Sequence, residues 1–144
     1  MKYRYSIDGV SYSGAEIPDI PIVRLTLRRK DKRMKATGTA IVDTGFDGGV
    51  YPNLQLLKFF ENLEPLSVEK LGTTSEEIVD CEVYTVNGTL ISVDGSLEIN
   101  LGEVKTYIPV DPAYIGEETL IGREILNKLK TILDGVNTEL SPHV

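Results

Sequence analysis

The stretch Ala40-Ile41-Val42-Asp43-Thr44-Gly45 decides most of what this sequence predicts. An apolar run ends abruptly at a carboxylate, and threonine and glycine follow it. A carboxylate directly behind a buried strand is held by rigid backbone and partly desolvated, and these conditions move a pKa toward a catalytic value. Asp43 is therefore a candidate catalytic acid. The alternative is a turn aspartate that caps a loop, with Thr44 and Gly45 present for backbone shape.

Upstream of this stretch the pattern indicates a β-hairpin. Residues 22–27 place Val23, Leu25 and Leu27 at period two, as in a half-buried strand, and residues 36–42 form the second strand. The charged segment between them is rich in lysine and arginine and contains Arg28, Arg29, Lys30, Lys32, Arg33 and Lys35. Because no aromatic residue is interleaved with these charges, we interpret them as a solvated hairpin tip rather than a nucleic-acid patch.

Downstream, most segments favour β-structure. A short helix is predicted to run to about residue 62 and to end before Pro65. Alternating β-formers occupy residues 66–100, with turns expected at residues 72–77, at Asn87-Gly88 and at Asp94-Gly95. A further strand is expected at 104–110 and a second short helix at 124–130. The predicted fold class is therefore all-β, and a parallel doubly wound sheet is disfavoured.

A second motif, Leu120-Ile121-Gly122-Arg123-Glu124-Ile125-Leu126, begins 77 residues after Asp43. Two apolar residues precede a glycine, and a polar pair then opens a helix. Together the two motifs resemble those of the retropepsin-like aspartic proteases, whose pattern is an apolar strand, Asp-Thr-Gly, a flap hairpin, Ile/Leu-Gly-Arg and a short helix. The resemblance extends from about residue 22 to residue 135 and implies a closed, barrel-like acid protease fold.

The resemblance also implies roles for individual residues. Asp43 would be the catalytic aspartate, Thr44 would hydrogen-bond across a subunit interface, and Gly45 would let substrate backbone approach closely. Asp47 matches a family aspartate that contacts substrate backbone and forms a structural pair with the arginine of the second motif, here Arg123. The other reading of Arg123 is a surface arginine at a helix N-terminus.

Two positions depart from the family pattern. Phe46 stands where a small residue is usual, which we expect to crowd the floor of the substrate pocket. The flap tip falls near Gly72, Thr73 and Thr74, which are the remaining predicted substrate-binding residues, and it lacks the glycine-rich sequence of viral members.

The aspartic protease mechanism needs two carboxylates that share one proton. The sequence has one Asp-Thr-Gly and no second copy, so the resemblance implies an aspartic endopeptidase that acts as a homodimer on peptide or protein substrates. The alternative is a noncatalytic dimeric barrel of the same fold that binds peptide or protein, because a fold does not prove turnover.

Composition bounds the remaining possibilities. The 144 residues suit one domain, with residues 1–20 as an N-terminal extension that could add an edge strand, cover the cleft or lengthen a dimer seam. The net charge of −7 disfavours nucleic acid and anionic membrane as partners. The single cysteine, Cys81, and the single histidine, His143, make no zinc site, so no metal or cofactor is expected. With no signal-like segment, we expect a cytoplasmic protein.

Overall fold

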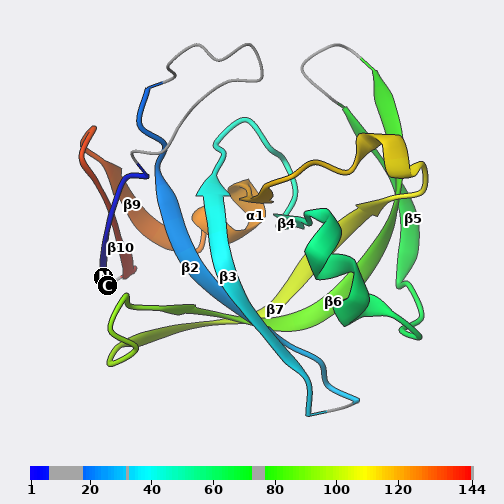
Figure 1. Cartoon of the computed structure of the whole chain (residues 1–144), viewed down its shortest axis with the longest axis horizontal. Coiled ribbons are helices and arrows are strands. Elements are labelled where there is room, and N and C mark those ends of the chain that lie inside the picture. The colour runs from blue at the N-terminus through cyan, green and yellow to red at the C-terminus, as the bar shows by residue number, and fades with distance from the viewer. Residues whose placement is uncertain (7–17, 32, 73–76, 144) are drawn as a thin grey trace.

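The computed structural model describes residues 1–6, 18–31, 33–72 and 77–143, and in these ranges the chain is mostly β-structure (Figure 1). The elements along the chain are β1 (Lys2–Arg4), β2 (Ile22–Arg28), β3 (Lys35–Val42), β4 (Val50–Tyr51), the 3₁₀ helix η1 (Leu54–Phe60), β5 (Ser67–Gly72), β6 (Ile78–Ile91), β7 (Glu98–Pro109), the 3₁₀ turn η2 (Pro112–Tyr114), β8 (Thr119–Ile121), α1 (Arg123–Leu126), β9 (Leu129–Leu133) and β10 (Asn137–Pro142). No helix in these ranges has the length and hydropathy that a bilayer crossing requires.

Six strands close into a barrel. Hydrogen-bonded neighbours follow the order β2-β3-β8-β4-β7-β6, and β6 also pairs with β2, so the sheet closes on itself. β5 lies outside this ring and, among the described strands, pairs only with β6. Closure satisfies the backbone groups of the paired residues, which an open sheet would leave free at its edges. The predicted all-β, barrel-like fold class is confirmed.

The chain ends build a separate sheet in the order β1-β10-β9. β1 lies at one edge of it and pairs with β10 from Lys2–Glu139 to Arg4–Asn137. The backbone of Met1 extends this ladder, because its amide oxygen accepts from the Leu140 amide at 2.8 Å. The two described ends of the chain therefore lie next to each other, as Figure 1 shows.

The barrel interior is filled by aliphatic side chains from nearly every strand. Leu27, Leu90 and Ile121 are among the largest side chains with no appreciable exposure. A smaller cluster of Val79, Cys81, Val83 and Tyr107 lies under the β5–β6 hairpin. Two cores therefore support two different regions, the barrel and the base of the hairpin.

The predicted hairpin of residues 22–42 is confirmed, since β2 and β3 pair in register from Ile22–Ile41 to Arg28–Lys35. The first predicted helix is present as η1, in which the Asn53 side chain accepts from the Leu56 amide as a cap. It is 3₁₀ helix rather than α-helix.

Three expectations about local structure are wrong. The second helix ends at Leu126, because strand β9 begins at Leu129 and pairs with β10. Asn87-Gly88 is not a turn, because β6 runs through it, and a Cβ at Gly88 would make a tight contact of 3.0 Å with the Val104 side chain. The strand predicted at 104–110 begins at residue 98, directly after the Asp94-Gly95 turn.

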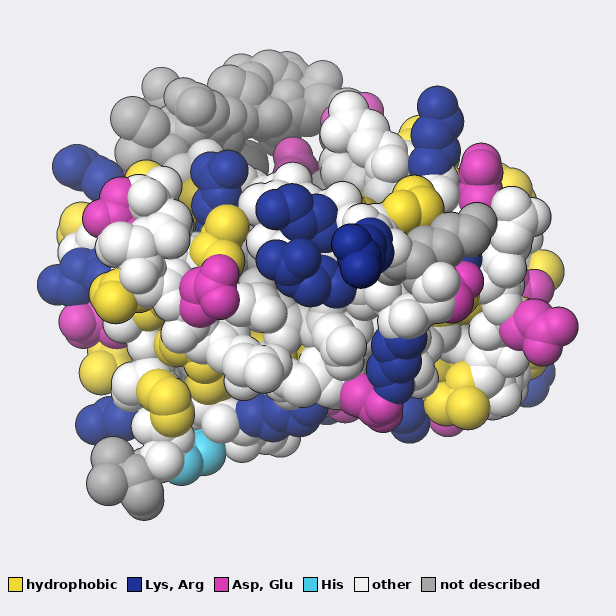
Figure 2. Space-filling view, turned by 90° about the horizontal axis from the view of Figure 1, so that it is seen from below, with side chains coloured by type: hydrophobic (Ala, Val, Ile, Leu, Met, Phe, Trp, Pro, Cys, Tyr) yellow, Lys and Arg dark blue, Asp and Glu magenta, His cyan; other side chains and the backbone are white. Residues whose placement is uncertain are grey.

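The β2–β3 hairpin tip is basic, and Figure 2 shows Lys and Arg side chains gathered on the face that carries it. Arg29 is the exception to the prediction of a solvated tip, because it is only 5% exposed. Its guanidinium donates to the carbonyl oxygens of Phe59 and Glu61 at the end of η1 and pairs with Asp31. This arginine therefore fastens η1 to the hairpin, while Lys32 lies outside the described residues.

Candidate active site

The Asp43 loop, residues 43–49, begins where β3 leaves the barrel. The Asp43 amide donates to the Ile121 carbonyl at 2.9 Å, and the Asp43 carbonyl accepts from the Phe46 amide at 3.2 Å. The Asp43 carboxylate accepts from the Gly45 amide at 2.9 Å. Asp43 is half-buried, whereas Thr44 and Gly45 are exposed. The backbone thus fixes the carboxylate at the end of a strand whose last three residues are buried or half-buried.

The second motif holds this loop in place. The amides at the start of α1 donate to three loop carbonyls: Gly122 to Gly49 at 2.8 Å, Arg123 to Phe46 at 2.9 Å and Glu124 to Gly48 at 3.2 Å. These bonds satisfy the amides that the first turn of a helix leaves unpaired. Two segments that are far apart in the sequence therefore form one unit.

Glycine is required at position 122 for a steric reason. A Cβ there would lie 2.4 Å from the Gly48 carbonyl oxygen and 2.5 Å from that of Phe46. Both neighbours are backbone atoms, which cannot swing aside as a flexible side chain would. The glycine of the second motif is therefore what lets α1 approach the Asp43 loop.

Asp47 and Arg123 form the ion pair that the sequence suggested. The Nη2 atom of Arg123 donates to Oδ1 of Asp47, and both side chains are at least half exposed. An exposed pair of this kind contributes at most about 1 kcal/mol to folding. The pair fixes the direction of the Asp47 side chain in the Asp43 loop.

Phe46 turns its ring onto two tyrosines. Its centroid lies 5.8 Å from that of Tyr51 and 6.1 Å from that of Tyr107, both edge-to-face. Phe46 remains half-buried, so its ring connects the loop to the smaller core cluster. Edge-to-face pairs contribute about 0.5–1.5 kcal/mol beyond their buried area.

Tyr107, Tyr51 and Glu124 are site residues that the sequence reasoning missed. The Tyr107 hydroxyl donates to Oε1 of Glu124 in α1, and its pKa is raised well above the usual value by burial and by this bond. The Tyr51 hydroxyl donates to the Tyr114 carbonyl at 2.7 Å, and burial raises its pKa to about 12. No short-range pattern marks these residues, because their partners lie on other elements.

The β5–β6 hairpin, which we call the flap, occupies the position expected from the sequence. Gly72 ends β5 and is exposed, while the predicted substrate-binding residues Thr73 and Thr74 lie outside the described residues. Leu71, near the end of β5, and Phe46 of the Asp43 loop both pack on the smaller core cluster, so the flap and the loop share one apolar floor. Cys81 lies in that floor, and burial raises the pKa of its thiol to about 11.

Metal ligands do not gather at this site. Within the described residues, no group of three or more His, Cys, Asp or Glu side chains is arranged to hold an ion. The donors at the loop are two carboxylates, Asp43 and Asp47, and the second is paired with arginine. What the loop offers chemically is one carboxylate, Asp43, that backbone hydrogen bonds hold in position.

Comparison with known proteins supports the fold. No family model and no curated protein sequence matches the chain. A crystal structure of a retropepsin-like aspartic protease from Rickettsia conorii is similar in fold, with a TM-score of 0.53 over 96% of this chain and 97% of that one, at 13% sequence identity. The chain therefore has a retropepsin-like acid protease fold, as the two motifs led us to expect.

Proposed function

We propose that this protein is an aspartic endopeptidase whose active form is a homodimer, with Asp43 of each copy facing the other across a two-fold axis. The observation that carries the proposal is the contact between the two motifs, in which Gly122 and Arg123 hold the loop that presents Asp43. A turn aspartate present only for backbone shape does not require a second, distant motif to fix it.

The chemistry follows from two carboxylates at close range. Like charges a few ångströms apart cannot both ionise, so the pair holds one proton. The ionised Asp43 acts as general base on a water molecule, and its protonated twin polarises the scissile carbonyl. The exposed Gly45 backbone lies beside the carboxylate, where an extended peptide can pass closely. The flap covers the substrate from the other side.

The terminal sheet offers a surface for the second copy. β9 lies at its edge and follows α1, the helix that holds the Asp43 loop. Ile132 and Leu133 on β9 are 43% and 41% exposed, and Val136 in the next turn is 54% exposed. Apolar side chains on an open strand edge favour association with a second chain.

The direct test is cleavage of a random peptide library across about pH 3 to 7, where a shared-proton pair can work. We expect a bell-shaped rate profile that is lost in Asp43→Asn. Asp94→Asn is the matched control, because it makes the same change of charge in the exposed β6–β7 turn. Peptide retained without cleavage by both wild type and Asp43→Asn would instead indicate the noncatalytic peptide-binding barrel.

A mixing experiment tests the dimer separately. Wild type and Asp43→Asn are exchanged in equal amounts at constant total concentration, and the cleavage rate is measured. If one aspartate must come from each copy, activity falls to about one quarter of that of wild type, because only pure wild-type pairs are active. A fall to about one half would show that each chain works alone.

A further inference from the structure

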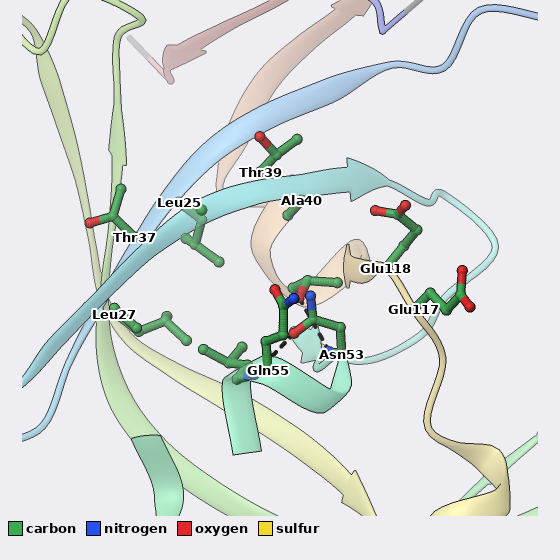
Figure 3. Close-up of a pocket in the computed structure, with 13 residues that line it drawn as sticks. Leu25, Leu27, Thr37, Thr39, Ala40, Asn53, Gln55, Glu117 and Glu118 are labelled. Atoms are coloured by element: carbon green, nitrogen blue, oxygen red, sulfur yellow. Dashed lines mark hydrogen bonds between the residues drawn. The ribbon is translucent and has the colours of Figure 1, made fainter. Parts of the chain in front are cut away.

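A groove away from the Asp43 loop lies along the side of β3 that does not pair with β2. It has a volume of about 440 Å³ and runs along β3 between η1 and the segment that precedes β8 (Figure 3). None of its lining residues belongs to the Asp43 loop or to the flap. Leu25, Leu27 and Ala40 line its apolar side, and the walls are polar.

The groove is bordered by an open sheet edge. Residues 35–39 of β3 pair with β2 along one side, whereas β8 reaches only Ala40, Ile41 and Val42 on the other. No strand within the described ranges pairs with this free side of residues 35–39. The backbone therefore presents a row of hydrogen-bonding groups about 17 Å long, at about 3.3 Å per residue.

The free edge arises because the segment before β8 turns away from β3. A continuation of the β8 register would place Glu118 beside Thr39, but Gly116 instead forms a parallel bridge with Asn53. The segment thus turns toward η1 and leaves Glu117 and Glu118 exposed at one end of the groove (Figure 3). Neither carboxylate has an ion-pair partner among the described residues.

The opposite wall is held firmly. Arg29 binds the last carbonyls of η1, and the Asn53 side chain caps its first turn. On β3 itself, Ala36, Gly38 and Ala40 alternate on the face toward the groove. Small side chains along an open edge let a second backbone approach within hydrogen-bonding distance. The groove is therefore formed before any ligand enters.

We propose that this groove binds an extended, basic peptide segment of a partner protein, which adds as a strand to the free edge of β3. Main-chain hydrogen bonds to residues 35–39 give affinity, as in other cases of strand addition. Glu117 and Glu118 select lysine or arginine at one end of the segment, because two unpaired carboxylates attract a cation there. This site is separate from Asp43 and does not depend on the proposed protease activity.

The test uses fluorescence anisotropy in the Asp43→Asn background, so that the probe is not cleaved. Two labelled probes each contain about seven alternating threonine and valine residues, and one carries two arginines at its N-terminus and the other two at its C-terminus. A control peptide carries glutamates in place of the arginines. At least one arginine probe is expected to bind about tenfold more tightly than the glutamate control. Equal binding of basic and acidic probes would overturn the proposal.

Variants of the groove separate it from the active-site cleft. A Cβ at Gly38 meets nothing within 4 Å, so Gly38→Leu is expected to fold and to fill the groove, with loss of at least about tenfold in affinity. Glu117→Gln/Glu118→Gln should weaken binding and flatten its salt dependence. Glu64→Gln/Glu98→Gln is the matched control, because it removes the same charge elsewhere on the surface and should bind as wild type does.

A measurement on the unmodified groove covers the case in which a variant misfolds. Amide hydrogen exchange of residues 35–39 should slow when the arginine probe is added, because strand pairing protects backbone amides. Unchanged exchange at saturating probe would contradict the proposal. Self-association that disappears in Gly38→Leu would contradict it too, since a second copy would then be the occupant.

Discussion

The Asp43 loop and the flap lie on the same side of the barrel, but the chain holds them in opposite ways (Figure 1). Backbone hydrogen bonds join the loop to four consecutive residues that run from β8 into α1, namely Ile121, Gly122, Arg123 and Glu124. The loop backbone is therefore held by contacts with other elements. Within the part of the chain that the structure describes, β5 of the flap pairs only with β6, and Leu71 is its one residue that is not exposed.

This difference separates two requirements of peptide hydrolysis. A carboxylate that must meet its twin within a few tenths of an ångström needs a loop with no freedom. A hairpin that must admit and cover a peptide needs few tertiary contacts, because such segments open at low free-energy cost. Under the proposed function, the Asp43 loop meets the first requirement and the flap meets the second.

The largest expected effect comes from a pair of glycine substitutions. Gly122→Ala forces a Cβ to within 2.4 Å of a loop carbonyl, whereas a Cβ at Gly72 in β5 meets nothing within 4 Å. Gly122→Ala should lower the free energy of unfolding by about 3 kcal/mol, and Gly72→Ala by less than about 0.5 kcal/mol. Urea denaturation of both variants measures this, and equal losses would break the comparison.

Tyr107→Phe tests the hydrogen bond that joins the smaller core cluster to α1. Loss of the hydroxyl that donates to Glu124 should cost about 1 kcal/mol of unfolding free energy at neutral pH. The folded-state pKa of Tyr107 is raised, so its contribution is complete below about pH 10 and declines as the pH rises further.

The pH dependence of the Tyr107 contribution can also be measured in Tyr107→Phe. Unfolding free energy of the variant, measured from about pH 8 to 11, should fall less steeply than that of wild type. Tyr84→Phe serves as a comparison in the barrel, because its pKa is also raised, to about 12. Identical slopes for Tyr107→Phe and wild type would show that burial and the bond to Glu124 do not raise the pKa of Tyr107 in solution.

Two exposed ion pairs provide a smaller and sharper contrast. Arg123→Met breaks the pair with Asp47 at the loop, and Lys70→Met breaks the 3.3 Å pair with Asp80 in the flap. Each should change the free energy of unfolding by less than about 1 kcal/mol. Peptide cleavage should fall only in Arg123→Met, through a higher KM, because Asp47 loses its orientation. An equal fall in peptide cleavage by Lys70→Met would show that the orientation of Asp47 is not what sets KM.

The smallest effect is expected on the flap surface. Ile78 is 67% exposed at the start of β6, and Val93 is 72% exposed in the distant β6–β7 turn. Ile78→Thr and Val93→Thr should each change the free energy of unfolding by less than about 0.5 kcal/mol. Steady-state kinetics should show a raised KM for apolar peptides with Ile78→Thr alone. An unchanged KM would place substrate away from this end of the flap.

Local patterns were sufficient where one element acted on its own. The period-two alternation of residues 22–27 predicted β2, and the apolar run ending at Asp43 predicted β3 and its pairing with β2 in a hairpin. The patterns failed at Asn87-Gly88 and at residues 127–130 because tertiary pairing overrode them. β6 bends through Gly88 against Val104, and Leu129 is taken into β9 by its ladder with β10.

The candidate site shows the same division. Asp43, Gly122 and Arg123 could be named from two short motifs, because each motif carries its own backbone requirement. Tyr107, Tyr51 and Glu124 could not, because their roles come from contacts between β4, β7, α1 and the loop. Arg29 was assigned to solvent because charge alone does not reveal that carbonyl groups of η1 lie within its reach.

By itself the amino-acid order determined that the chain is mostly strand, that a single carboxylate follows a buried strand, and that a distant glycine and arginine accompany it. These properties depend on residue type and near neighbours. Only the tertiary structure decided that β8 pairs with just three residues of β3, which leaves residues 35–39 with no second strand partner among the described residues. The same holds for the burial of Arg29. The physical reason is that strand pairing and burial depend on which distant segments pack against a residue. Local sequence patterns do not identify those segments.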